Sequence, residues 1–427
     1  MTALWAALLA LVQSGDGDWP RFRGPNGDGV APAESDPPTE WSESRNVAWK
    51  TALPGRGRSS PILQGDRLFV TFARERNVRR TRIGPDDMQV ADHVALGIAA
   101  VDARSGGILW ETPLREVERP DPVHWLNSWA TPTPVVGAGR LFCDFGGWGT
   151  WCLDPATGKV LWEKRIPLDH QVGPGSSLAF EEGLLVLVRD GREAQFVLAL
   201  DGTTGETVWK TDRPPIRTNH PNTRKSFSTP IRIESGGRRR LVAAGPHWIA
   251  SYDPSTGREL WRLRHGEGFS IGSVPVFGHG LVYFSTGCMR PSLLAVRADG
   301  EGELPPSAVA WRADKGVPVM SSPILAGELL YWTSDEGILT AANARTGEVR
   351  FQARLGEGHL ASPILAAGRL YFFGREGKTT VVRPGSAFEK LAENRIEGTV
   401  IASPAVSGKA LFLRTDTHLY RLENRAP

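Results

Sequence analysis

The chain is poor in several residue types, and each shortage excludes a class of protein. Its 427 residues include only three cysteines, four methionines and five tyrosines, so a disulfide-rich scaffold is excluded. No two cysteines have the C-x-x-C spacing of a zinc site. The 50 Lys and Arg and the 47 Asp and Glu nearly cancel, to a net charge of +3, and this balance gives no indication of a nucleic-acid partner.

Patterns that accompany enzymes are missing too. The sequence has no H-E-x-x-H and no P-loop, and it has neither a G-x-S-x-G elbow nor a dinucleotide fingerprint in a strand-to-helix context. Helical periodicity is nearly absent, which excludes DNA-reading helices. We therefore assign no catalytic residue and no metal site. The abundant residues are 48 glycines, 32 prolines and 15 tryptophans. The glycines and prolines indicate many turns, and hence many short strands.

The N-terminus predicts export. Residues 3–12 form an apolar run that is too short to cross a bilayer and fits the hydrophobic part of a secretory signal peptide. We assign residues 1–15 to a signal peptide, 16–45 to an extended segment and 46–427 to one domain. No cysteine follows the run, so no lipid anchor is indicated, and no transmembrane segment is expected. We expect a monomer in the periplasm or outside the cell.

A repeat dominates the rest of the chain. An acidic or amide residue is followed by Gly four positions later and by an aromatic residue eight positions later. The copies are Asp102-Gly106-Trp110, Asp154-Gly158-Trp162, Asp201-Gly205-Trp209, Asp253-Gly257-Trp261 and Asn343-Gly347-Phe351, with a worn copy ending at Trp311. Asp bonds its own backbone and Gly accepts a positive φ, so the first two positions predict a turn between two strands. The aromatic residue lies on the second strand, where it can pack between neighbouring units.

A second series marks the start of each unit with small residues before a proline. The markers are Ser60-Pro61, Thr133-Pro134, Thr229-Pro230, Val274-Pro275, Ser322-Pro323, Ser362-Pro363 and Ser403-Pro404, with Ser177-Leu178 as a variant. Apart from the first, the units are close to the length of a four-stranded propeller blade, about 40–45 residues.

We therefore predict an all-β protein, an eight-bladed β-propeller of four-stranded antiparallel blades. The last unit stops short of a fourth strand, whereas residues 46–50 precede the first unit as a strand without a blade. We expect this N-terminal strand to complete the last blade and close the ring. Six tryptophans then have a structural role on the outer strands: Trp49, Trp110, Trp162, Trp209, Trp261 and Trp311.

Two of the cysteines lie in one hairpin. A turn centred between Gly147 and Trp148 would place Cys143 directly across from Cys152. Facing Cα atoms in a hairpin are close enough for a disulfide, and the alternative is two buried free thiols.

The Asp-x-x-Thr-Gly-x-x-x-Trp repeat, over about residues 46–427, resembles that of the pyrroloquinoline-quinone-type eight-bladed propellers. Residues 18–29, DWPRFRGPNGDG, are similar to the leader segment of exported planctomycete propellers. The resemblance implies two classes of function. Quinoprotein dehydrogenases oxidise alcohols or sugars, and the propeller lipoprotein of the outer-membrane β-barrel assembly machine is a protein-binding scaffold.

The dehydrogenase class implies a calcium ion held by Glu, Asn and Asp, a catalytic Asp and, in many members, two adjacent cysteines over the quinone. This chain has no adjacent cysteines, and we match no calcium ligands to it. We expect no cofactor. The alternative is pyrroloquinoline quinone with calcium, which no site motif of this sequence supports. The scaffold class carries a lipid-anchoring cysteine that is also missing here.

Candidate binding residues lie in loops expected on one face of the ring. Residues 74–93 form a long insertion with five arginines, and the loop before the fourth blade carries further cations, which together suggest a patch for an acidic partner. These cations are Arg74, Arg76, Arg79, Arg80, Arg82, His220, Arg224 and Lys225. The segment His124, Trp125, Asn127 and Trp129 suits stacking on a sugar or planar ligand. Structural packing of both tryptophans is the alternative.

From these observations we expect an exported, non-catalytic propeller scaffold that binds a protein or polymer in the cell envelope through its loop face. A quinone-dependent alcohol or sugar dehydrogenase and a polysaccharide-binding protein are the alternatives.

Overall fold

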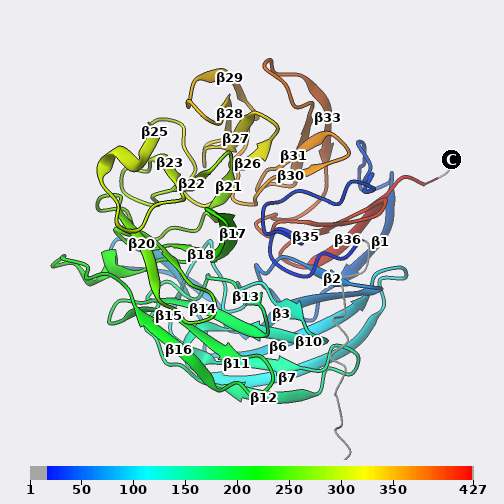
Figure 1. Cartoon of the computed structure of the whole chain (residues 1–427). Coiled ribbons are helices and arrows are strands. Elements are labelled where there is room, and N and C mark those ends of the chain that lie inside the picture. Colours follow the sequence, from blue (N-terminus) through cyan, green and yellow to red (C-terminus); the bar gives the residue numbers. More distant parts are fainter. Residues whose placement is uncertain (1–16, 426–427) are drawn as a thin grey trace, which may run out of the picture.

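The computed structural model describes residues 17–425, and its strands form a ring of eight antiparallel sheets (Figure 1). The strands of each blade are given from the axis outward. Blade 1 has β2 (Ile62–Gln64), β3 (Arg67–Arg76), β6 (His93–Asp102) and β7 (Ile108–Glu118), and blade 2 has β9 (Val135–Gly137), β10 (Arg140–Asp144), β11 (Thr150–Leu153) and β12 (Val160–Lys164). Blade 3 has β13 (Ala179–Glu181), β14 (Leu184–Asp190), β15 (Gln195–Asp201) and β16 (Thr207–Asp212), and blade 4 has β17 (Ile231–Ser235), β18 (Arg238–Ala244), β19 (Trp248–Tyr252) and β20 (Glu259–Arg264).

Blades 5 to 8 follow the same order. Blade 5 has β21 (Val276–Gly278), β22 (Leu281–Ser285), β23 (Leu293–Arg297) and β25 (Val309–Ala313), and blade 6 has β26 (Ile324–Ala326), β27 (Leu329–Thr333), β28 (Ile338–Asn343) and β29 (Val349–Arg354). Blade 7 has β30 (Ile364–Ala366), β31 (Arg369–Phe373), β32 (Lys378–Val382) and β33 (Lys390–Arg395), and blade 8 has β34 (Ala405–Ser407), β35 (Ala410–Arg414), β36 (His418–Glu423) and β1 (Val47–Ala52).

The remaining elements are short. They are β4 (Arg79–Ile83), β5 (Asp86–Val90), β8 (Val123–His124), β24 (Gly302–Glu303) and the 3-10 helices η1 (Gly146–Trp148), η2 (Pro221–Arg224), η3 (Pro306–Ala308). Strand β24 adds to the outer edge of blade 4 by pairing with β20 in parallel. No helix of residues 17–425 is long and apolar enough to cross a membrane.

The ring closes as expected. Strand β1 pairs antiparallel with β36, so the start of the domain supplies the outermost strand of the last blade. This pairing removes the open edge that an incomplete eighth sheet would present. The eight-bladed, all-β prediction is confirmed.

The Asp-Gly-Trp repeat joins neighbouring blades over most of the ring. In blade 1, Asp102 Oδ1 accepts hydrogen bonds from the backbone N–H groups of its own turn at 2.6–3.0 Å. Gly106 in that turn has a φ of +76°, and a Cβ there would lie 2.6 Å from the Trp49 ring of blade 8. Trp49 Nε1 donates to the Ala103 carbonyl at 3.1 Å. The glycine is therefore required both by its own conformation and by the aromatic ring that covers it.

The residues before the prolines form a second link near the axis. The N–H of Ser60 donates to the Thr133 hydroxyl, and the N–H of Thr133 donates to the Ser177 hydroxyl, both at 2.9 Å. The pattern runs from blade 1 to blade 4 and from blade 5 to blade 8. At blade 5 the corresponding residue is Val274, and there the Ser228 hydroxyl donates instead to the Ser273 carbonyl at 2.8 Å.

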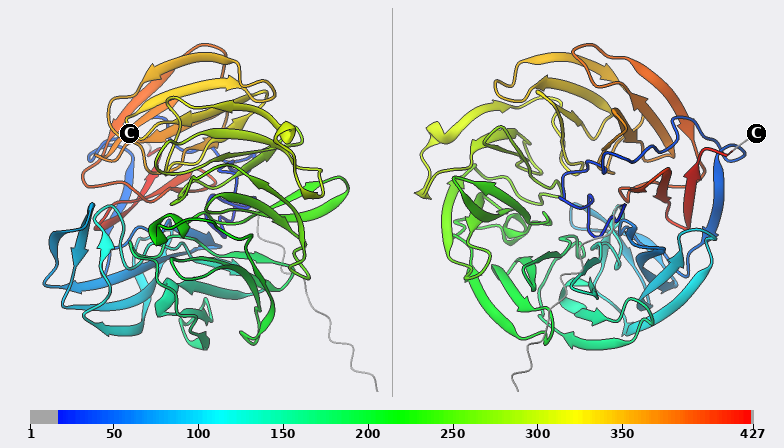
Figure 2. Two further views of the ribbon diagram at one scale, coloured as in Figure 1. Left: turned by 90° about the vertical axis from the view of Figure 1, so that its left-hand side faces the viewer. Right: turned by 45° about the vertical axis from the view of Figure 1, so that its right-hand side comes forward.

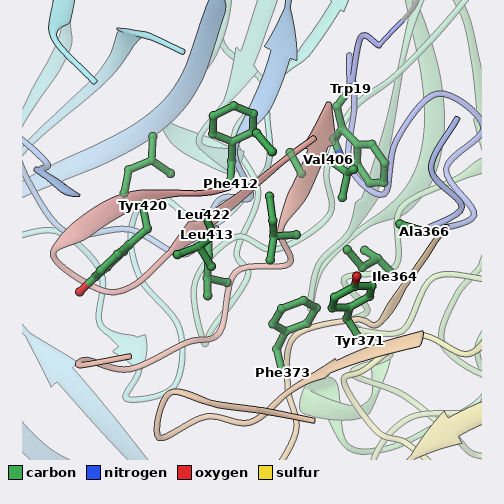
Figure 3. Packing of buried hydrophobic residues seen from close by; sticks show 14 of the residues in the cluster. Trp19, Ile364, Ala366, Tyr371, Phe373, Val406, Phe412, Leu413, Tyr420 and Leu422 are labelled. Carbon is green, nitrogen blue, oxygen red and sulfur yellow. The ribbon is translucent and has the colours of Figure 1, made fainter. Parts of the chain in front are cut away.

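The N-terminal segment enters the channel of the ring, where it crosses the centre in Figure 2. Trp19 exchanges backbone hydrogen bonds with Leu63 of blade 1 at 2.8–3.0 Å. Its ring is fully buried and lies beside Val406 of blade 8 (Figure 3). Arg23, also buried, donates to the Pro323 carbonyl before blade 6 at 2.8 Å. The segment thus bridges opposite sides of the channel. Residues 1–15, predicted to be a signal peptide, lie outside the described residues.

The predicted register of the cysteine hairpin is wrong, and of the two alternatives the structure has the buried free thiols. Cys143 pairs with Trp151, and Cys152 pairs with Phe142. The hairpin is therefore centred on Gly147, whereas the prediction centred it between Gly147 and Trp148. A register change of one residue turns each side chain to the other face of the sheet. Cys143 therefore packs between blades 1 and 2, Cys152 packs between blades 2 and 3, and both are free thiols.

Candidate functional site

The face on which the second-to-third-strand loops and the inter-blade loops emerge, here the loop face, carries a small extra sheet. The insertion after β3 is a β-hairpin, β4–β5, and β8 pairs with β5 to give the order β4-β5-β8. The hairpin turns through Gly84 and Pro85, and Gly84 has a φ of +61°. A glycine at the first position is typical of a two-residue hairpin loop, so Gly84 in the sequence already indicates this hairpin.

Strand β4 is the outer edge of this sheet, and all five of its residues are exposed. Arg79, Arg80 and Arg82 occupy three of its five positions. Its free backbone groups can pair with another extended chain, because an unprotected edge is a template for a further strand.

Most of the hairpin arginines have acidic partners. Arg79 lies 3.2 Å from Asp92, and Arg80 lies 2.7 Å from Asp87. The hydrogen bond from Arg80 lowers the pKa of Asp87, and hydrogen bonds from Asn77 and then Arg79 lower the pKa of Asp92. Arg74 pairs closely with Glu111, and Arg76 lies 3.9 Å from Glu118. The predicted cationic patch is therefore a mixed patch, in which exposed pairs of this kind bind each other weakly and can exchange partners.

The aromatic segment beside the hairpin divides into two roles. The Trp125 ring lies between Arg80, 4.3 Å from its centroid, and Arg375 of blade 7, at 5.7 Å. Trp129 is fully buried and its Nε1 donates to the Asp121 carbonyl at 2.9 Å. Only Trp125 of this pair is placed to meet a ligand at the surface.

Asn127 and His124 hold the segment in place. Asn127 Nδ2 donates to the carbonyls of Val172 and Pro174 at 2.9–3.0 Å, so the amide joins two inter-blade loops. The backbone N–H of His124 donates to the Val172 carbonyl at 3.0 Å. Burial lowers the pKa of the His124 imidazole. Both residues therefore order the loops.

The tip of the hairpin meets the loops of blades 2 to 4. Gln171 Nε2 donates to Asp86 Oδ2 at 3.1 Å, while Gln171 Oε1 accepts a hydrogen bond from Lys225 Nζ. Burial lowers the pKa of Lys225 to about 8. The two predicted cationic loops do come together here, through Gln171, which no sequence motif indicated. His220 and Arg224 lie in and beside η2, where His220 is exposed and Arg224 donates to the Thr218 carbonyl.

Large apolar side chains are exposed on the same loop face. Met289 is 78% exposed and follows β22, while Val78 and Ile83 belong to the inserted hairpin. Methionine adapts to differently shaped partners, and exposed apolar groups among arginines are characteristic of protein interfaces.

A quinone held by calcium would need free space in the channel and a group of oxygen ligands. Trp19 and Arg23 of the chain itself fill part of the channel. Within residues 17–425, no three His, Cys, Asp or Glu side chains are grouped so that they could hold a metal ion. We therefore derive no reaction step through such a cofactor.

The fold and its repeat define a propeller of the pyrroloquinoline-quinone-like class. A family model described as outer membrane protein assembly factor BamB matches residues 96–350 and, in an overlapping match, residues 245–390. These matches cover more than half of the chain, and the chain belongs to this family.

Relatives of both functional classes resemble it. The BamB structure from Moraxella catarrhalis superposes with a TM-score of 0.55 at 12% identity, over 82% of this chain and 98% of that one. A europium-containing methanol dehydrogenase superposes with a TM-score of 0.53 at 13% identity, over 86% and 89% of the two chains. At these identities the likeness concerns the fold alone.

A polyvinylalcohol dehydrogenase of a Pseudomonas species is 25% identical over 229 residues, which are 49% of this chain and 30% of the relative. The matched part is therefore less than a third of that enzyme's length.

Proposed function

We propose that this protein is a non-catalytic scaffold of the cell envelope, which binds an acidic, extended segment of a partner protein along β4. The single observation that carries the proposal is the exposed edge of β4, five residues long with three arginines. A strand added there would gain backbone hydrogen bonds, and its acidic side chains would replace Asp87 and Asp92 as partners of the arginines.

Charge selects the partner at this edge. Two copies of β4 repel each other because each presents the same arginines, which disfavours self-association of this edge. An acidic strand faces no such repulsion. Met289 and Ile83 supply apolar area beyond the edge itself.

The proposal is tested by reversing charge on the two faces of the ring. Arg79→Glu with Arg82→Glu alters β4, whereas Arg238→Glu with Arg239→Glu makes the same change of charge at the start of β18, next to its turn with β17 on the opposite face. A photo-crosslinking residue at Ile83 should capture a defined envelope protein, and the β4 variant should reduce its yield at least tenfold. Equal yield from the two double variants would rule out docking at β4.

The dehydrogenase alternative is supported by the names of the curated relatives. Purified protein mixed with pyrroloquinoline quinone and calcium distinguishes the classes. Dye-linked oxidation of alcohols or sugars would overturn the scaffold proposal, and absence of quinone binding would remove the alternative.

A further inference from the structure

We infer that a cavity on the loop face, between the loops of blades 1 to 3, is a binding site for one neutral sugar residue. The cavity has a volume of 280 Å³. Its lining includes Trp148, Asp121, Arg165, His170 and Glu193. No residue of β4 lines it, so this inference does not rest on the proposed docking of a partner protein.

His170 supplies the first evidence for a polar ligand. Both of its ring nitrogens are buried, and neither has a hydrogen-bond partner among residues 17–425. Burial lowers the pKa of His170 to about 3, so the ring is neutral at physiological pH. A neutral imidazole has one donor and one acceptor, which is the pairing that hydroxyl groups of a sugar satisfy. Leaving both nitrogens unpaired costs free energy, which a bound hydroxyl group would recover.

The carboxylates around the cavity are oriented by the protein. Arg192 Nε lies 2.7 Å from Asp169 Oδ2, and the Asp169 N–H donates to Glu193 Oε1 at 2.8 Å. Because Asp169 already has a cationic partner and Arg165 also lines the cavity, the site is not a strong receptor for a free cation. Fixed acceptors of this kind suit hydroxyl donors.

Trp148 adds the apolar surface that a sugar ring requires. It lies at the end of η1 and lines the cavity while remaining partly buried against the core of blades 1 and 2. An indole face beside directed polar groups is the usual composition of a site for an amphipathic ring.

The dimensions indicate how much of a glycan enters. A volume of 280 Å³ is near the lower end of small-molecule sites, about 300 Å³, so one ring fits rather than several. Asp121 and Arg165 are exposed at the rim, which leaves the site open to solvent. The ligand is then a terminal or branching residue of a polysaccharide.

Titration of intrinsic tryptophan fluorescence with maltotetraose, cellotetraose and the tetramer of N-acetylglucosamine tests the inference. We expect saturable binding of at least one tetramer below about 10 mM. His170→Phe, which keeps an aromatic ring but has neither donor nor acceptor, should weaken binding at least tenfold. His220→Phe, an exposed histidine outside the cavity, should leave it unchanged.

A second variant guards against misfolding of the first. Asp121→Asn changes one exposed rim carboxylate, should retain the melting temperature, and should weaken sugar binding severalfold if its carboxylate accepts a hydroxyl proton. No binding of any tetramer, or equal binding by wild type and His170→Phe, would overturn the inference. Calcium or spermidine binding that needs Asp121 and Glu193, without sugar binding, would identify a cation site and overturn it as well.

Discussion

The indole nitrogen of Trp209 in blade 3 donates a hydrogen bond to the carbonyl oxygen of Pro254 in blade 4, over 3.1 Å. The same bond joins Trp49 to Ala103, Trp162 to Gly202, Trp261 to Ala298 and Trp311 to Ala344. Trp110 occupies the same position in blade 1, yet its buried Nε1 has no hydrogen-bond partner among residues 17–425. The indole hydrogen bond is thus present at five of the eight junctions. Between blades 1 and 2 the tryptophan is present without the bond, and between blades 6 and 7 Phe351 has no indole N–H to donate.

Replacing Trp209 with Phe should cost more stability than replacing Trp110 with Phe. Both changes keep an aromatic ring, but only the first removes a hydrogen bond and leaves the Pro254 carbonyl unpaired. The difference in unfolding free energy should be about 1 kcal/mol. Urea denaturation of both variants measures it, and equal losses would show that the indole hydrogen bond adds nothing to the junction.

Gly257→Ala should destabilise the ring more than Gly280→Ala. The two glycines have φ angles of +71° and +74°, so both substitutions carry the same backbone strain. A Cβ at position 257 would lie 2.4 Å from the Trp209 ring, whereas nothing lies within 4 Å of one at position 280. Displacing the ring should add about 1–3 kcal/mol. Thermal unfolding compares the two, and a matching loss would indicate that the ring shifts freely.

The protein should contain three free thiols without prior reduction. Cys143 and Cys152 lie on opposite faces of their sheet, and burial raises the pKa of Cys152 to about 11. In the native state the partly exposed Cys288 should react first with a thiol reagent, and in denaturant all three should react. If only one thiol reacted in denaturant, the other two cysteines would be bonded, and the disulfide between Cys143 and Cys152 would be supported.

Acid should destabilise the fold through its buried histidines. Burial lowers the pKa of His359 to about 4, below the ordinary value of 6.5, so between these pH values the unfolded chain binds the proton more readily than the folded one. The stability that this difference supplies is present above pH 6.5 and falls as pH drops toward 4, by up to about 1.4 kcal/mol per pH unit.

Replacement of His359 with Gln removes that titration. Stability measured by urea at pH 7 and pH 5 should therefore depend less on pH in His359→Gln than in the wild type. His220→Gln, at an exposed histidine, is the matched control and should retain the wild-type pH dependence. An unchanged pH dependence in His359→Gln would show that another group controls acid unfolding.

The sequence predicts the ring because its repeat is made of residues with local roles. Asp102 bonds its own turn, Gly106 adopts a positive φ, and an aromatic residue covers the glycine from the neighbouring blade. Each role depends on a fixed spacing, so the number of blades and the closure by residues 46–50 follow from counting. The hydroxyl residues before the prolines show in the sequence only where each blade begins. In the structure their side chains also accept hydrogen bonds that join one blade to the next.

The site was less predictable because it depends on contacts between distant loops. The meeting of Asp86, Gln171 and Lys225 joins three separate parts of the chain, and no local pattern records it. Trp129 and Trp125 look equivalent in the sequence, yet only one is buried. The cysteine prediction failed on a single residue of register, which depends on η1 shaping the turn rather than on composition.

Closure by β1 and β36 has a kinetic consequence. The carbonyl of Val47 accepts a hydrogen bond from Arg425, 378 positions later, so β1 can pair only after β36 has been synthesised. Until then β1 has no partner strand, and contacts so distant in sequence form slowly. The ring therefore stays open while blades 1 to 7 are made. Cell machinery that handles unfolded chains has that whole interval in which to act on it.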